Sequence, residues 1–185
     1  GPALLFETSS GNAALMDFYT EYARYPYTYS LTSAVYDIMP NYTDFTLLKP
    51  LFPGYNFSVI DNLHYYHNDR DNFANIHPES IAHYGVQLAP MVKEYLTGNQ
   101  YSDPDYFRSR ENKVVFTIPG LGTFSFSRTG YCLLNAVTLA LFVLTLTLYV
   151  VTGRIKLRKV FYNSLTILGC GVLIAAVATG LAYAA

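Results

Sequence analysis

The chain has 185 residues and a formal net charge of −1, with 51% apolar and only 14% charged residues. A net charge this close to zero gives no electrostatic reason to expect nucleic acid as a partner. The sequence is mixed and rich in tyrosine up to about Arg128, and it is almost uncharged after Gly130. Both cysteines, Cys132 and Cys170, lie in this apolar part, so we expect neither a disulfide framework nor a paired-cysteine metal site.

Strand and helix patterns alternate over the first hundred residues. Apolar runs and aromatic–polar alternation predict strands, while capping residues and prolines mark the ends of helices. The expected order is a strand at 2–8, helices at 12–24, 30–38 and from 43 to before 50, a strand at 55–60 and a long helix at 78–98. This order predicts an α/β layered domain.

The long helix starts at Pro78, a residue suited to the first helical turn, and Gly98 is a natural terminator. Pro90 removes one backbone hydrogen bond, so we expect a kink there. Apolar and aromatic residues recur at helical spacing and predict the face that packs on the core, made of Ile81, Tyr84, Leu88, Val92 and Tyr95.

A polar linker at 99–105 and a β-hairpin are expected next, with strands at 114–118 and 123–127 around a Pro-Gly-Leu-Gly turn. We therefore divide the chain into a layered domain at 1–98, a linker with a hairpin at 99–129 and an apolar region at 130–185.

Two uncharged stretches, at about 131–152 and 161–183, predict a transmembrane hairpin. A helix of this length covers roughly 30 Å, the thickness of the hydrocarbon core; a pair of buried core helices is the alternative. The connection at 153–160 carries four basic residues and no acid, which predicts that it is cytoplasmic. The residues before Gly130 would then lie on the extracytoplasmic or lumenal side of the bilayer.

All four histidines lie between His64 and His83, mixed with aspartates and Glu79. Imidazole and carboxylate groups are the side chains that hold zinc, so this part of the chain is a candidate metal site. Surface polarity is the alternative. His77 precedes the proline that starts the long helix, and His83 lies within that helix, where packing or exposure explains it.

The residues Tyr66-His67-Asn68-Asp69-Arg70-Asp71 resemble the Tyr-His-Thr-x-x-Asp signature of metallopeptidase family 28, the co-catalytic two-zinc aminopeptidases. Asn68 stands where the family usually has threonine. Three further segments resemble the family in the same order, namely the strand at 1–8, Thr43-Asp44-Phe45 and Phe52-Pro53-Gly54-Tyr55. The resemblance covers residues 1 to about 96, and the apolar region that follows resembles the membrane-bound branch.

This resemblance implies the C-terminal portion of a three-layer α/β/α zinc-peptidase domain, followed by a small β segment and two transmembrane helices. It implies a membrane-anchored enzyme that hydrolyses N-terminal peptide bonds of a peptide substrate with a metal-activated water. Two zinc ions would be bound in the full-length protein. The other ligands and the general base would lie before Gly1, so we expect this chain alone to be inactive.

The resemblance assigns His67 as the last zinc ligand and gives no catalytic residue in this chain. Asp71 is a partner that would orient the imidazole or the loop, with a turn-capping role as the alternative. Tyr66 and Asp44 are candidates for the substrate pocket, although the sequence favours packing for Tyr66 and a structural role, such as helix capping, for Asp44.

Two other functions remain open. A peptidase-like domain that has lost its metals would serve as a scaffold or binding module in the membrane, and the residues upstream of Gly1 would distinguish it from an enzyme. A transport component is a third class, but two spans without an internal charge offer no path for an ion or polar substrate.

Overall fold

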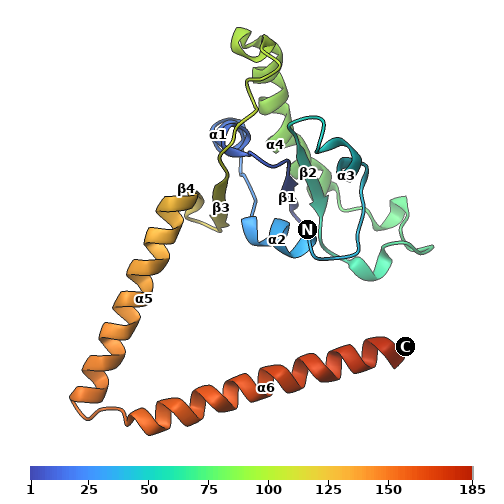
Figure 1. The fold of residues 1–185 in the computed structure, drawn as a ribbon. Coiled ribbons are helices and arrows are strands. Elements are labelled where there is room, and N and C mark those ends of the chain that lie inside the picture. Colours follow the sequence, from blue (N-terminus) through green and yellow to red (C-terminus); the bar gives the residue numbers. More distant parts are fainter. Residues whose placement is uncertain (185) are drawn as a thin grey trace. The chain divides into compact units, whose positions relative to one another are not determined.

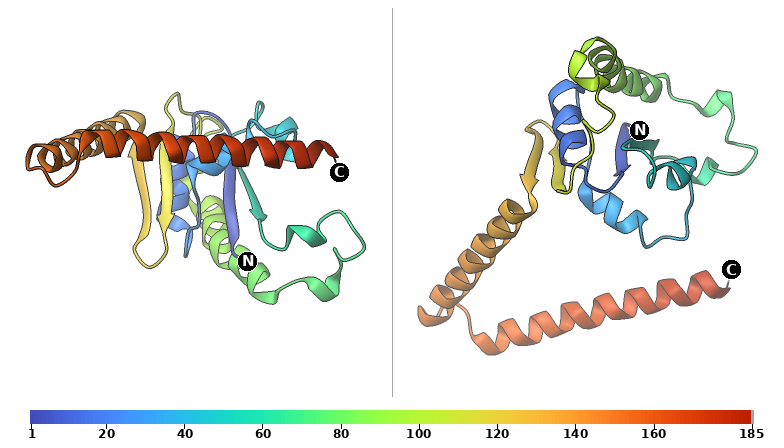
Figure 2. Two further views of the ribbon diagram at one scale, coloured as in Figure 1. Left: turned by 90° about the horizontal axis from the view of Figure 1, so that it is seen from below. Right: turned by 45° about the horizontal axis from the view of Figure 1, so that its top comes forward.

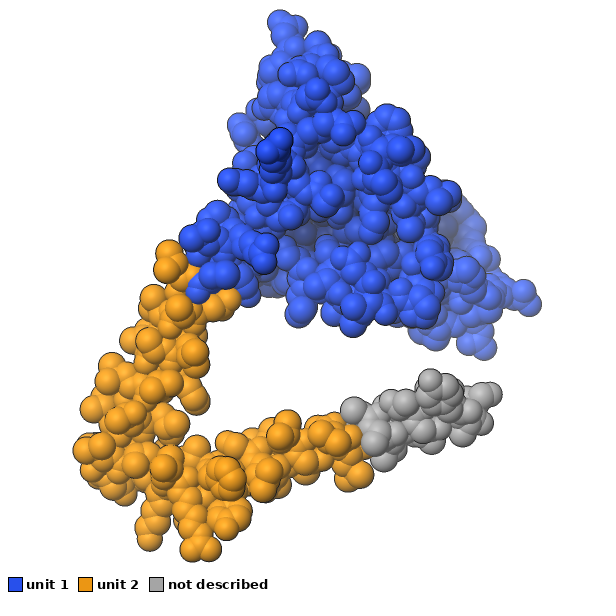
Figure 3. All heavy atoms as spheres, in the orientation of Figure 1, with its two compact units in different colours: residues 1–132 blue, residues 133–185 orange. Residues whose placement is uncertain are grey.

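The computed structural model describes residues 1–184, with side chains described up to residue 174. The chain forms two compact units, which are coloured separately in Figure 3. The first comprises Gly1–Cys132, and the second begins at Leu133.

The strands of the first unit form two antiparallel pairs, β1 with β2 and β3 with β4 (Figure 1). Backbone bridges link the two pairs through the segment after α1: Leu5 pairs with Thr28, and Tyr29 pairs with Phe116. The predicted strands and hairpin are confirmed. Their bounds are β1 Ala3–Thr8, β2 Tyr55–Val59, β3 Lys113–Ile118 and β4 Gly122–Ser127.

The helices of the first unit follow the predicted order. Asn12, Thr43 and His77 occupy the cap positions of three of them, and Gly98 ends the longest. The α-helices are α1 Ala13–Tyr22, α2 Ser30–Tyr36, α3 Asp44–Leu48 and α4 Pro78–Thr97, and single 3₁₀ turns occur at η1 Leu63–Tyr65, η2 Phe73–Asn75 and η3 Asn99–Ser102.

The core lies where β1, α1, α4 and β3 meet. Its buried members are Leu5, Met16, Phe18, Tyr19, Ala23, Met91, Tyr101 and Val115. Burial of each large apolar side chain stabilises the fold by about 1.5–3 kcal/mol. Tyr101 corrects the expectation of a polar linker at 99–105: its ring stacks on that of Phe107 at 5.6 Å and meets that of Phe18 edge-on at 5.2 Å.

The buried face of α4 differs in part from the predicted one. Leu88 packs against the core as predicted. Ile81, Val92 and Tyr95 are at least half exposed, whereas Ser80, Gln87 and Met91 are buried. The reason is a hydrogen-bond network that apolar periodicity does not reveal.

Gln87 is the centre of this network. Its Nε2 donates to the Ala3 carbonyl at 2.9 Å, and its Oε1 accepts from the Tyr19 hydroxyl at 2.5 Å. That hydroxyl in turn accepts from the Tyr27 N–H, and burial raises the Tyr19 pKa above its usual value. One turn earlier, His83 Nδ1 accepts from the Ala3 N–H at 3.0 Å. Because buried polar groups must be paired, this polar face is the one that packs on β1.

A bulge in β1 directs a carboxylate into the protein. The register shifts between Leu5 and Glu7, and Glu7 is only 2% exposed. Its carboxylate binds Lys49 Nζ at 2.6 Å and Asn56 Nδ2 at 2.9 Å. The hydrogen bond that the Lys49 ammonium donates to Glu7 raises the pKa of Lys49. The Glu7–Lys49 ion pair connects β1 to the end of α3. A bulge commonly changes the direction in which a side chain points.

The second unit contains most of α5 Arg128–Val151 and all of α6 Leu157–Ala184. Both are long and apolar enough to cross a membrane, and the most apolar part of each helix is not buried within the described residues. They match the two predicted apolar stretches.

Candidate metal-binding site

Residues 62–76, which follow β2, form a loop with two short 3₁₀ turns (Figure 2). Three asparagine side chains close this loop onto its own backbone. The amide groups of Asn68, Asn72 and Asn75 donate to the carbonyls of His64, Asp69 and Arg70 at 2.9, 2.8 and 2.7 Å. Such side chain–backbone bonds stabilise turns where no regular ladder is available.

His67 lies two residues after the first 3₁₀ turn and has a left-handed backbone, φ +60°. This conformation is uncommon for a non-glycine residue, although histidine is among the residue types that adopt it more often. The side chain is exposed, and its ring meets that of Tyr66 edge-on at 4.0 Å. None of the hydrogen bonds described for residues 62–76 uses this ring. The imidazole is therefore accessible to a metal ion.

Asn68 has a role that sequence reasoning missed. Its Nδ2 donates to the carbonyls of His64 and Tyr66 at 2.9 and 3.4 Å, and its Oδ1 accepts from the Arg70 N–H at 2.9 Å. These bonds enclose the left-handed residue His67. The Asn-x-Arg spacing offers a signal, because asparagine commonly bonds to a backbone N–H two residues on.

Of the other predicted site residues, Tyr66 contacts the His67 ring, whereas no described hydrogen bond joins Asp71 or Asp44 to His67. Asp71 donates its backbone N–H to the Asn68 carbonyl at 2.9 Å, and no described hydrogen bond joins its carboxylate to His67. Its orienting role stays a prediction. Asp44 is the first residue of α3 and is exposed, one position after the cap Thr43. Tyr66 is 64% exposed.

Among the described residues, no cluster of three or more histidine, cysteine, aspartate or glutamate side chains is arranged to hold a metal ion. His64 packs beside Tyr65, His77 occupies the N-cap position of α4, and His83 Nδ1 accepts a hydrogen bond from the Ala3 N–H. Because zinc sites need three or four protein ligands, the described residues by themselves do not fit a two-zinc centre.

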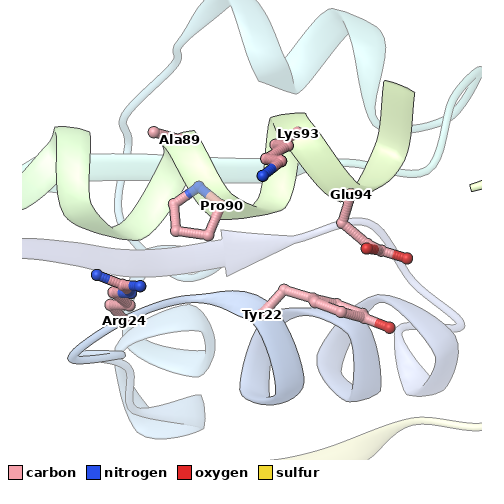
Figure 4. A pocket seen from close by; sticks show the side chains of 6 residues that line it. All are labelled: Tyr22, Arg24, Ala89, Pro90, Lys93 and Glu94. Carbon is pink, nitrogen blue, oxygen red and sulfur yellow. The ribbon is translucent and has the colours of Figure 1, made fainter. Parts of the chain in front are cut away.

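His67 does not line either of two hollows formed by described residues of the first unit. Figure 4 shows one of about 410 Å³ between α1 and α4, lined by Tyr22, Arg24, Ala89, Pro90, Lys93 and Glu94. The other, about 400 Å³, is lined by Gly1, Pro2, Asp61, His77, Glu79, Ser80 and His83.

Comparison with known proteins shows which proteins the chain is similar to. It is 27% identical to endoplasmic reticulum metallopeptidase 1 of Homo sapiens over 70% of this chain and 15% of that protein. It is also 27% identical to the putative endoplasmic reticulum metallopeptidase 1-A of Caenorhabditis elegans, over 73% of this chain and 16% of that protein, and to the Rattus norvegicus metallopeptidase 1, over 89% and 18%. No family model and no solved structure matches.

The relatives that the chain resembles are therefore metallopeptidases, which belong to family 28. Within that family, the proteins it resembles here are the endoplasmic reticulum metallopeptidases 1 of human, rat and nematode. It spans 15–18% of the length of these relatives. Together with the two apolar helices, the relatives are consistent with a membrane protein.

Proposed function

We propose that this chain is part of a membrane-anchored, zinc-dependent aminopeptidase and that His67 supplies the last zinc ligand of its two-metal site. The single observation that carries the proposal is that the His67 imidazole is exposed and makes no described hydrogen bond. It stands at the histidine of the family's motif, in a chain similar to named metallopeptidases. When bound, the zinc ions supply an activated water for peptide hydrolysis. The remaining ligands and the base are contributed by other parts of the whole protein.

In this proposal Asp71 orients the loop, and Tyr66 and Asp44 lie near the substrate. Exposure of Tyr66 and Asp44 is compatible with contact to a peptide. The substrate would be bound by its N-terminus, as in other aminopeptidases.

We further propose that the first unit is one portion of a three-layer α/β/α domain. Leu5 packs with Met16 of α1, whereas the Phe6 ring meets that of Tyr36 in α2 at 4.9 Å, so that helices contact β1 from both faces. Exposed apolar side chains on α2, just after it and on α3 support packing against further parts of such a domain; they are Leu31, Val35, Ile38, Met39, Leu47 and Leu48.

We also propose that α5 and α6 span the bilayer, with residues 153–160 on the cytoplasmic side and the peptidase domain outside the cytoplasm or in the lumen. The four basic residues of that connection support this orientation.

The decisive experiment replaces His67 by alanine in the full-length protein. We expect loss of about one of two bound zinc ions, measured by metal analysis after dialysis, and a fall in kcat/KM of at least about 100-fold. Mutation of a residue that only hydrogen-bonds to a metal ligand already lowers metal affinity or activity by about 10–100-fold. His64→Ala is the matched control, because His64 lies in the same loop but is not assigned to the metal.

Unchanged zinc content and turnover in His67→Ala would remove the assignment. A wild-type full-length protein that binds no zinc and hydrolyses no peptide would instead support the metal-free scaffold. The 185-residue chain alone should take up zinc only weakly, because it provides a single ligand, and tight stoichiometric uptake in calorimetry would contradict this.

A further inference from the structure

The charged side chains in the connection between α5 and α6 are all positive. Residues 153–159 contain Arg154, Lys156, Arg158 and Lys159, and the sequence has no aspartate or glutamate from Arg128 to its last residue. All four basic residues are exposed. Their charges are therefore not neutralised by an acidic group of the second unit.

The local structure keeps these cations close together. Gly153 adopts a left-handed backbone, φ +69°, and donates its N–H to the Val150 carbonyl at 3.0 Å, while the Ile155 N–H donates to the Tyr149 carbonyl at 3.1 Å. These bonds end α5 in a tight turn. Residues 158 and 159 then fall in the first turn of α6, where the helix dipole disfavours positive charge. An anionic partner would offset both the mutual repulsion and the unfavourable dipole.

Two arginines stack on tyrosines at the helix ends. The guanidinium of Arg154 lies 5.8 Å from the centre of the Tyr149 ring, and that of Arg158 lies 5.5 Å from the centre of the Tyr162 ring. A stacked guanidinium uses its face and leaves its edge N–H groups free to bind phosphate oxygens. Tyrosine at the end of an apolar helix is typical of the membrane interface.

Apolar side chains alternate with the basic ones. Leu157 and Phe161 are 61% and 64% exposed, and Ile155 is 37% exposed. A segment that has both basic and apolar side chains is suited to the boundary between the phosphate groups and the acyl chains of a membrane.

We propose that residues 153–159, together with Tyr149 and Tyr162, form a binding surface for the phosphate groups of anionic phospholipids. The inference rests on the proposed membrane insertion of α5 and α6 and is independent of the peptidase proposal. It holds for whichever leaflet contains the connection.

The test uses the full chain in phosphatidylcholine vesicles that contain spin-labelled lipid. Electron paramagnetic resonance compares the association of spin-labelled phosphatidylglycerol with that of spin-labelled phosphatidylcholine. We expect at least about a fivefold preference for the anionic lipid, the effect of one cation close to an anionic surface. The preference should decrease in 1 M NaCl, because exposed charges are screened at that ionic strength.

The quadruple variant R154Q/K156Q/R158Q/K159Q should lose the preference. Its matched control, R24Q/R70Q/K93Q/R110Q, removes the same number of exposed cations from the first unit and should keep it. R154K/R158K retains the charge but loses the planar edge, so we expect an intermediate preference.

Other outcomes overturn the proposal. An equal reduction of the lipid preference in the two quadruple variants would show that net charge alone attracts the lipid. Abolition of the preference by 10 mM inorganic phosphate would identify a site for free phosphate instead. A chain that enters vesicles without lipid preference contradicts this proposal alone. A chain that does not enter them contradicts membrane insertion as well.

Discussion

At the scale of single residues, the loop at 62–76 is organised by amide side chains. His67 has a left-handed backbone, which costs about 1–2 kcal/mol relative to the usual right-handed conformation for a residue with a Cβ atom. The hydrogen bonds of Asn68 to His64, Tyr66 and Arg70 offset this cost. The residue that departs from the family's usual threonine is thus the one that holds the turn together.

Asn68→Ala should loosen this turn. The Arg70 N–H loses its acceptor, and a hydrogen bond contributes about 1 kcal/mol, so we expect its hydrogen exchange to accelerate roughly threefold to tenfold in NMR measurements. Asn72→Ala is the control: it removes the acceptor of the Ala74 N–H at 3.1 Å and should leave the Arg70 amide unaffected. An unchanged Arg70 exchange rate in Asn68→Ala would show that this turn is held by other contacts.

At the scale of elements, long-range polar contacts position the helices. Gln87 and His83 hold α4 on the backbone of Ala3, and the Glu7–Lys49 pair joins β1 to the end of α3. Both contacts reach β1, the strand at the centre of the first unit. Its outer neighbour β2 leads directly into the candidate metal-binding loop, so these contacts determine where that loop starts.

Lys49→Met should destabilise the first unit by about 3 kcal/mol, because it leaves the buried carboxylate of Glu7 without its cation. Denaturant unfolding of the chain in detergent, followed by tyrosine circular dichroism, measures this loss. The Lys49 pKa is raised in the folded state, so the stabilisation is complete below the usual lysine pKa and is lost as the pH rises through the higher folded value.

The control for Lys49 is Lys113, which pairs with Asp17, a residue whose side chain is 57% exposed. Lys113→Met should cost less than about 1 kcal/mol, as is usual for surface pairs. Adding Glu7→Gln to Lys49→Met should recover most of the loss, since no unpaired charge then stays buried. A double variant as unstable as Lys49→Met would argue against a charge-based cause.

At the scale of the whole molecule, the chain combines a unit with a mixed α/β fold and a unit of two apolar helices. The proposed orientation places the first unit outside the cytoplasm and the connection of α5 and α6 inside. Orientation follows from the distribution of basic residues around the spans, so it can be tested by accessibility alone.

Ser102→Cys, in a background with Cys132 and Cys170 replaced by alanine, should react with a membrane-impermeant maleimide applied to intact cells, or to sealed vesicles that expose the extracytoplasmic face. Ser102 is exposed in η3. Ile155→Cys in the same background is the matched probe and should react only after the membrane is opened. The reverse pattern of labelling would invert the proposed topology.

Much of the local structure could be predicted because its causes are local. The prolines at 26, 50 and 78, the caps Thr43 and His77, and the hairpin turn act over a few residues. They identified the strands and helices to within about two residues at each end, as expected for such signals. The apolar helices α5 and α6 were equally accessible to sequence reasoning, because length and composition alone define them.

The sequence by itself therefore determined the order of elements, the two apolar helices, the basic connection between them and the motif that contains His67. Only the tertiary structure decided which face of α4 is buried, that Tyr101 belongs to the core, and that Glu7 is paired inside the protein. The physical reason is distance along the chain: Gln87 meets Ala3 and Glu7 meets Lys49 across 84 and 42 residues. Periodicity and capping describe neighbours in sequence, whereas these contacts arise only when the chain has folded.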